Sequence, residues 1–346
     1  MINRLLLLLL VVFCLSCQPE VCTTELAFYH WKTHYNPDSL AEAYLQQLPT
    51  QRLYLRLFDI DWHPEQQRPV PKAIASLDQQ LPPQVEIVPT IYITNRTLLQ
   101  ASPAQLETLS QQLLDKLAEY FPLTGVPEVQ IDCDWTGNSR EAYFRFLHML
   151  RQLLPQSTQL SVTLRLHQYR WPEKTGVPPA DRSMLMFYNM GDLNDWQEPN
   201  SILNLEKAQA YLQHTSTYPL PMDIALPLFR WGVLYRYGQM IRLINGLTVE
   251  QMDTTLIRPQ DETNTRFRVT ESTYLQGYYL YAGDEIRLEA VTPEQLLKAA
   301  KMLRPISCSG PRHLAFYHLD STIVQAFPME MLRSVQQALQ QETELE

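Results

Sequence analysis

Short apolar runs alternate with helical patterns along most of the chain. The strand-like runs lie at residues 26–31, 53–62, 85–93, 128–135, 159–169, 184–190, 223–229 and 313–320. Between them, apolar residues mostly recur at three- and four-residue spacing, as in helices that bury one face. The crossover around residues 170–182 is rich in Pro and predicts an irregular segment. Strand and helix alternating eight times predict an α/β fold of the (β/α)₈, or TIM barrel, type.

An open doubly wound sheet would show a similar alternation. However, no Gly-rich phosphate turn follows the first run, which removes the main support for a dinucleotide-binding fold. The first and last runs share the sequence LAFYH, and a closed barrel makes them neighbours. Cys22 precedes the first run and Cys308 the last, so a Cys22–Cys308 disulfide across the seam is geometrically feasible. Two free cysteines are the alternative.

Residues 232–290 interrupt the alternation after the seventh strand-like run. The stretch RFRVTESTYLQGYYLYAGDEIRLEA predicts short strands around turns. We therefore expect a barrel over residues 25–346 that carries a small inserted subdomain at about 232–290, over its top face.

The first 17 residues have the pattern of a targeting segment. Arg4 precedes the apolar stretch 5–13, which is too short to span a bilayer and fits a signal peptide. The stretch ends in Cys14-Leu-Ser-Cys17, which resembles a bacterial lipoprotein signal with Cys17 as the lipidated residue, carrying acyl chains such as palmitate. Residues 18–24 would then form a tether. Gln18 rather than Asp after the lipidated residue favours the outer membrane of a Gram-negative cell envelope; an ordinary secretory signal is the alternative.

Composition and charge narrow the function classes. The net charge is −9 and no basic run occurs, which argues against nucleic-acid binding. Four histidines could join Asp59 or Asp61 in a metal site: His30, His63, His167 and His318. No metal-ligand spacing supports such a site, so we predict no metal and no cofactor, in a monomeric protein.

Side-chain alternation predicts a polar barrel interior. In the fourth run, Gln130, Asp132 and Asp134 would point inward, and in the fifth run Thr163, Arg165 and His167 would do so. Buried charges are costly unless paired, so Asp132 is expected to pair with Arg56 or Arg165. A purely structural ion network is the alternative for Asp132. Asp134 lies nearer the carboxyl end of its strand, where barrel active sites are built.

The six tryptophans fall at or soon after predicted strand ends. They are Trp31, Trp62, Trp135, Trp171, Trp196 and Trp231. Gathered on one face, such rings suit stacking against sugars, although some could fill the barrel mouth as core. We predict substrate binding by Trp31, Trp62, Trp135 and Trp231, together with Asn189, Asp59 and Asp61.

Two short motifs resemble the family 18 glycoside hydrolases, the chitinase-type barrels. That family carries D-x-x-D-x-D-x-E at the end of the fourth strand, and here the stretch is V-Q-I-D-C-D-W-T. Asp132 and Asp134 match the second and third acidic positions, Val129 replaces the first, and Thr136 replaces the general-acid glutamate. Met186-Phe-Tyr188-Asn189 matches the family's M-x-Y-N. The resemblance implies that Asp134 orients the substrate's N-acetyl group, which acts as the nucleophile, and that Tyr188 steadies that group.

A threonine hydroxyl is far too weak an acid to replace the glutamate. Another carboxylate could supply the proton: Asp134 itself, Asp59, Asp61, Asp192 or Asp320. The first hypothesis is therefore a hydrolase of oligosaccharides or polysaccharides, with Asp134, Asp132 and Tyr188 as catalytic residues. The second is a non-catalytic glycan-binding lipoprotein on the same fold. A structural or partner-binding envelope protein is a third.

Overall fold

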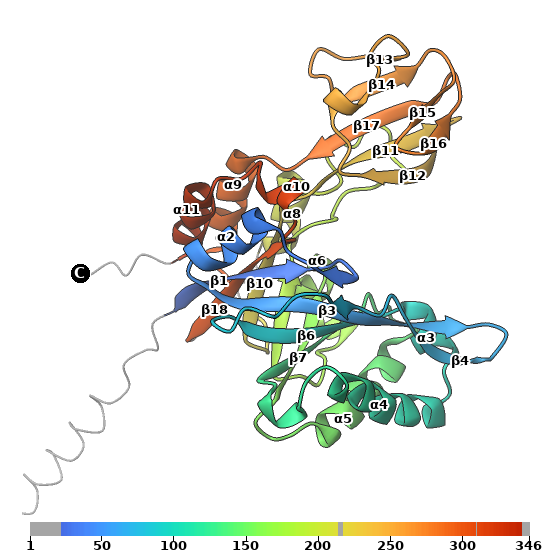
Figure 1. The fold of residues 1–346 in the computed structure, drawn as a ribbon. Coiled ribbons are helices and arrows are strands. Elements are labelled where there is room, and N and C mark those ends of the chain that lie inside the picture. The colour runs from blue at the N-terminus through green and yellow to red at the C-terminus, as the bar shows by residue number, and fades with distance from the viewer. Residues whose placement is uncertain (1–21, 214–216, 309, 341–346) are drawn as a thin grey trace, which may run out of the picture.

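The computed structural model describes residues 22–213, 217–308 and 310–340 (Figure 1). The predicted signal peptide, its lipidation residue Cys17 and most of the predicted tether lie outside the described residues. Among the described residues, no helix is both long and apolar enough to cross a bilayer.

Eight parallel strands close into a barrel, which confirms the predicted (β/α)₈ fold class. Their order around the barrel is β1-β18-β10-β9-β8-β7-β6-β3, and pairing of β1 with β3 closes the ring. The strands are β1 (Thr23–His30), β3 (Thr50–His63), β6 (Glu86–Ile93), β7 (Glu128–Asp132), β8 (Gln159–Leu164), β9 (Arg182–Met186), β10 (Met222–Pro227) and β18 (Pro311–Tyr317).

Helices pack around this barrel (Figure 1). They are α2 (Ser39–Gln47), α3 (Asn95–Gln100), α4 (Pro103–Ala118), α5 (Arg140–Leu153), α6 (Leu166–Arg170), α7 (Pro172–Thr175), α8 (Leu205–Leu212), α9 (Pro293–Leu303), α10 (Ser321–Val324) and α11 (Met329–Leu339), with the 3₁₀ turn η1 (Leu123–Gly125). A second 3₁₀ turn, η2 (Val249–Gln251), lies in the segment after β10. Local sequence sets their starts. Ser102 and Gln105 form a capping box before α4, and Thr292 and Gln295 do the same before α9.

The fifth strand is shorter than the sequence predicted. It ends at Leu164, and residues 166–170 form helix α6 instead. The Gln168 side chain accepts a hydrogen bond from the Arg165 backbone N–H and donates one to the Trp135 carbonyl, which fixes this early turn. As a result His167 lies exposed on α6, and its predicted place inside the barrel is wrong.

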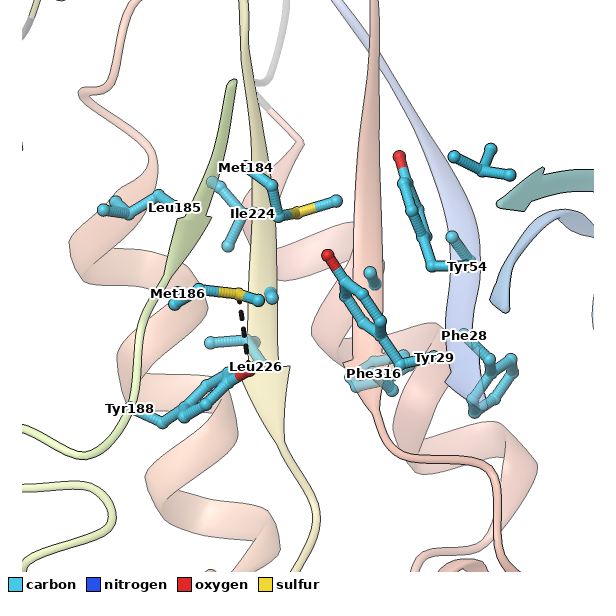
Figure 2. Packing of buried hydrophobic residues seen from close by; sticks show 14 of the residues in the cluster. Phe28, Tyr29, Tyr54, Met184, Leu185, Met186, Tyr188, Ile224, Leu226 and Phe316 are labelled. Carbon is cyan, nitrogen blue, oxygen red and sulfur yellow. Dashed lines mark hydrogen bonds between the residues drawn. The ribbon is translucent and has the colours of Figure 1, made fainter. Parts of the chain in front are cut away.

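The barrel interior is partly polar, and tyrosines fill much of it. Tyr29 of β1 donates a hydrogen bond to Gln130 of β7 at 2.6 Å, a bond between strands that are not neighbours and that therefore crosses the interior. The Tyr29 ring stacks on Tyr54, with centroids 4.8 Å apart (Figure 2). Near the amino end of the strands, Arg182 binds Asp223 in a buried ion pair. These pairings offset part of the cost of burying polar groups inside the barrel.

A disulfide joins Cys22 to Cys308, the pair that the sequence analysis expected, with Cα atoms 5.6 Å apart. Because Cys22 directly precedes β1 and Cys308 lies shortly before β18, the bond ties together the two strands at the chain's ends.

The segment after β10 forms a separate antiparallel sheet that projects from the barrel (Figure 1). Its strand order is β12-β11-β17-β14-β13, and a small hairpin, β15–β16, lies beside it. The strands are β11 (Arg230–Arg236), β12 (Gln239–Asn245), β13 (Ile257–Pro259), β14 (Arg266–Val269), β15 (Thr273–Leu275), β16 (Tyr278–Leu280) and β17 (Glu285–Ala290). We call residues 230–290 the insert. It has its own buried cluster, which includes Phe267 and Ile286.

Three short strands complete the chain: β2 (His34–Tyr35), β4 (Arg68–Lys72) and β5 (Ser76–Leu77). β4 pairs antiparallel with the far end of β3, so that β3 runs past the rim of the barrel as one arm of a hairpin.

Candidate functional site

A cleft of about 590 Å³ opens at the carboxyl ends of the barrel strands. Its wall contains residues from all eight barrel strands or the loops that follow them, and from the insert. Of the predicted site residues, the cleft brings together Trp31, Asp59, Asp132, Asp134, Tyr188, Asn189 and Trp231. A smaller hollow of about 350 Å³ shares Asp134, Arg165, Tyr188 and Asn189 with it and extends toward α6.

Asp132, the last residue of β7, lies partly buried in the cleft wall. It accepts a hydrogen bond from Thr163 Oγ1 of β8 at 2.6 Å. Burial, and next the negative charge of Asp134, raise the pKa of Asp132 from its ordinary value of 3.8 to about 6, although the Thr163 hydrogen bond opposes the change. A carboxyl with this pKa exists in both protonation states near neutral pH, as a general acid or base requires.

Asp134 follows β7 and is held by Arg165. The guanidinium donates to both carboxylate oxygens, from Nε at 2.5 Å and from Nη2 at 3.0 Å. Such a bidentate pair fixes the orientation of the carboxylate and neutralises its charge. Thr136, two residues further on, is exposed, and its backbone N–H donates to Ser139 Oγ at 2.9 Å in the turn before α5. Thr136 therefore lies in the turn that leads into α5 and does not line the main cleft.

The predicted pairing of Asp132 with Arg56 or Arg165 is wrong. Arg56 binds Asp59 instead, with Nε 2.8 Å from Oδ1, and it also lies over the Trp31 ring, 5.3 Å from its centroid. A β-bulge in β3 shifts the alternation between Arg56 and Phe58, which places Arg56 and Asp59 on the same side of the strand. Arg56 and Arg165 thus pair with Asp59 and Asp134, nearer the rim of the barrel. Among the described residues, no cation forms an ion pair with Asp132.

The fourth carboxylate of the cleft wall is Asp320, at the start of α10. It binds Lys32 at 2.5 Å and accepts from the Thr322 backbone and hydroxyl. Burial alone would raise the pKa of Asp320, but the Lys32 and Thr322 hydrogen bonds lower it overall. Its neighbour His318 is buried, and this burial lowers the His318 pKa to about 4, so the imidazole is neutral near pH 7. Asp320 is therefore a structural cap with its charge compensated.

Aromatic rings form a continuous wall around these charges. Trp31 lies 5.5 Å from Tyr317, which lies 5.3 Å from Tyr188 and 5.8 Å from Phe229, and Phe229 lies 5.1 Å from Trp231. Sugar rings present C–H groups that pack well against such faces.

Two hydrogen bonds fix members of this wall. Tyr188 donates its hydroxyl to Met186 Sδ at 3.3 Å (Figure 2), so in this structure the hydroxyl points along the strand rather than to an open part of the cleft. Trp231 donates its Nε1–H to buried Glu289 Oε2 at 2.9 Å. Glu289 also accepts from Ser201 and Arg287, so the insert holds Trp231 in a defined position.

Three predicted binding residues lie away from the main cleft. Asp61 and Trp62 sit on the extension of β3 that pairs with β4, where Asp61 binds Arg96 and Lys72. Trp135 is buried and stacks on Tyr143 of α5, at 5.0 Å between centroids.

Two further tryptophans, Trp171 and Trp196, pack edge-on against Tyr211 and Tyr235. Only Trp31 and Trp231 of the six line the main cleft.

The cleft also contains residues that the sequence analysis did not single out. Tyr92 is the penultimate residue of β6, Phe229 follows β10, and Arg230 and Asn245 belong to the insert. Burial, and next the charges of Asp134 and Asp132, raise the Tyr92 pKa to about 12. The position of Tyr92 near the carboxyl end of the predicted run 85–93, in register with Asp132, was a signal that could have found it. The insert residues depend on how the insert folds back, which periodicity does not predict.

Solved structures with a similar fold are chitinases and related lytic enzymes. The spore cortex-lytic enzyme SleL of Bacillus cereus matches with a TM-score of 0.53 at 14% identity, over 92% of this chain and 74% of that one. The chitinase of Chromobacterium violaceum matches with a TM-score of 0.52 at 11% identity, over 92% and 99%. This chain has the fold of the chitinase-type barrels.

The resemblance drawn from the two motifs is thereby confirmed at the level of the fold. Catalytic domain 2 of the Group II chitinase of Ostrinia furnacalis also matches, with a TM-score of 0.50 at 10% identity, over 91% of this chain and 96% of that one. No protein-family model matches the chain, and no curated protein sequence does.

Proposed function

We propose that this protein binds glycans in the strand-end cleft and hydrolyses them with Asp132 as the proton donor. The observation that carries the proposal is the cleft itself, in which a wall of aromatic rings surrounds a carboxyl whose pKa is raised to about 6. Aromatic faces suit sugar rings, and a raised carboxyl pKa suits proton transfer to a leaving oxygen. The likeness of the fold to chitinases supports the same class of substrate.

N-acetylated sugars are the proposed units. A mutant of the Ostrinia furnacalis domain was solved with penta-N-acetylchitooctaose, at a TM-score of 0.50 and 11% identity to this chain. In this scheme Asp134, fixed by Arg165, orients the substrate's N-acetyl group for attack on the anomeric carbon. Asp132 protonates the departing oxygen. Because the acid must carry its proton, cleavage should fall as the pH rises past about 6.

Binding without cleavage is the second candidate, and Thr136 favours it. The residue that aligns with the family's general acid is an exposed hydroxyl in the turn before α5, which cannot donate a proton near neutral pH. If Asp132 does not reach the glycosidic oxygen, the cleft would still hold a glycan by stacking and hydrogen bonding.

One experiment separates these functions. Purified protein is incubated with N-acetylglucosamine oligomers, and both binding and the release of new reducing ends are measured. Hydrolysis that Asp132→Asn abolishes, and that Asp115→Asn on exposed α4 leaves intact, supports the catalytic proposal. Binding with no release of reducing ends, weakened by Trp31→Ala, supports the binding module. Neither binding nor release across a broad set of glycans would refute both.

Anchoring in the cell envelope forms part of the proposal. It rests on the pattern at residues 1–17, where Cys17 would carry the lipid and present the barrel to glycans of the outer membrane or periplasm. Metabolic labelling with a fatty-acid analogue, lost in Cys17→Ala, tests it.

A further inference from the structure

Arg230 stands where the chain leaves the barrel and enters the insert. It is the first residue of β11, it is partly buried, and it is one of the residues that line the cleft. Trp231, Asn245 and Gly246 of the insert line the cleft with it. The insert therefore contributes one aromatic ring and one full positive charge to the wall.

Arg230 differs from the other cations of the cleft wall. Lys32 and Arg56 are bound to aspartates of the same wall, and so is Arg165. Within the part of the chain that the structure describes, the Arg230 guanidinium forms neither an ion pair nor a side-chain hydrogen bond. The Arg230 charge helps to lower the pKa of exposed Glu250, but it is the smallest of the causes. The hydrogen bond from Thr248 is the main cause of that lowered pKa.

A guanidinium in a cleft wall that has no partner among the described residues is available to an anionic ligand. Its planar group of five donors matches a carboxylate in a two-bond arrangement. Trp231 also lines this cleft, so the insert supplies both an aromatic residue and a cation to the wall. A glycan that occupies the cleft could then stack on an aromatic ring and pair with the guanidinium of Arg230.

We infer that the cleft takes a glycan in which a sugar carries a carboxylate, and that Arg230 binds this carboxylate. The inference rests on the proposed function and names its substrate class. A densely charged polyanion fits poorly, because three of the four cations are already neutralised and Asp132 adds negative charge above about pH 6. One free cation matches one carboxylate at this position.

The test compares oligosaccharides that differ only in the carboxyl group. One pair is a tetrasaccharide of alternating glucuronate and N-acetylglucosamine and its carboxyl-reduced form. A second pair is an N-acetylglucosamine tetramer with ether-linked lactyl groups on alternate sugars and its carboxyl-reduced form. Calorimetry on the full protein should show that one acid form binds about tenfold more tightly than its reduced partner, as expected for a charge-assisted hydrogen bond. The pair that shows this preference identifies the source of the carboxylate.

Variants then assign the preference to Arg230. Arg230→Gln should bring the ratio of the two affinities to about one, and Arg230→Lys should keep part of the preference because it keeps the charge. Arg268→Gln is the matched control, since Arg268 is exposed on β14 of the same insert and does not line the cleft. Thermal unfolding of each variant verifies that the fold is intact.

The outcomes separate this inference from the proposed function. If both forms of each pair bind equally, the glycan function stands and the inference is overturned. A sulfated tetrasaccharide that matches the acid form would also overturn the carboxylate assignment. If no member of either pair binds, and the neutral N-acetylglucosamine oligomers do not bind either, the proposed function falls together with the inference.

Discussion

Asp132→Asn should stabilise the protein, and the gain should depend on pH. The folded protein raises the Asp132 pKa from 3.8 to about 6, chiefly because the carboxyl is buried. At about 1.4 kcal/mol per pKa unit, this difference corresponds to about 3 kcal/mol. Asn has the same shape and its carbonyl oxygen can still accept from Thr163, so the substitution removes the charge with little other change.

The sign follows from which state holds the proton. Below about pH 4 the Asp132 carboxyl is protonated in both the folded and the unfolded chain, and it costs nothing. Between about 4 and 6 the unfolded chain releases the proton while the folded chain retains it, so the free energy of unfolding falls as the pH rises. Above about pH 7 the full cost of about 3 kcal/mol is present in the wild type and absent in Asp132→Asn.

Urea unfolding followed by tryptophan fluorescence, at pH values from about 4 to about 8, measures this difference. The free energy of unfolding of the variant minus that of the wild type should increase across the range and level off near neutral pH. Asp115→Asn is the control, because Asp115 is exposed on α4, where it accepts from Gln111 at 2.9 Å. A difference that stays constant with pH, or decreases, would refute the assignment of a buried and partly protonated carboxyl.

Two further changes test the frame around the site. Cys308→Ser should lower the free energy of unfolding by about 2–4 kcal/mol, because the disulfide to Cys22 closes a loop with a sequence separation of 286. If a reductant did not destabilise the wild-type protein, this prediction would be wrong. Arg165→Met should raise the Asp132 pKa above 6, because it removes a positive charge that lowers this pKa and leaves the Asp134 carboxylate unpaired beside it. A carbon-detected NMR titration measures the pKa, and an unchanged or lower value would contradict the prediction.

Periodicity predicted the barrel because each strand buries both of its faces, which leaves a strong apolar pattern in the sequence. Periodicity was less successful at strand ends, because local hydrogen bonds determine where a strand stops. β8 ends at Leu164 because the Gln168 side chain closes a helical turn onto the Arg165 backbone and Trp135. A glutamine four residues beyond the end of a strand carries no hydrophobic signal, so the sequence pattern predicted a strand that continued through His167.

The site was predictable in its residue types but not in its pairs. Alternation placed Asp132 on the inward side of its strand correctly, since it depends only on the backbone, whereas Asp134 lies past the strand end, in the cleft wall. Which arginine meets which aspartate depends on height along the barrel axis, and the bulge in β3 altered this for Arg56. Arg230 could not have been found, because the fold of the whole insert determines where the segment after β10 points.

The charges that remain unpaired are the strongest argument that this cleft has a function. A barrel that needed only to fold would pair its inward carboxylates, as it does for Asp59, Asp134 and Asp320. It keeps Asp132 without a cation, at a cost of about 3 kcal/mol near neutral pH. Among the residues that the structure describes, no anion pairs with Arg230 in the same wall either. A glycan with an acidic sugar would pair with Arg230, and a protonated Asp132 in the same wall would carry no charge to repel it.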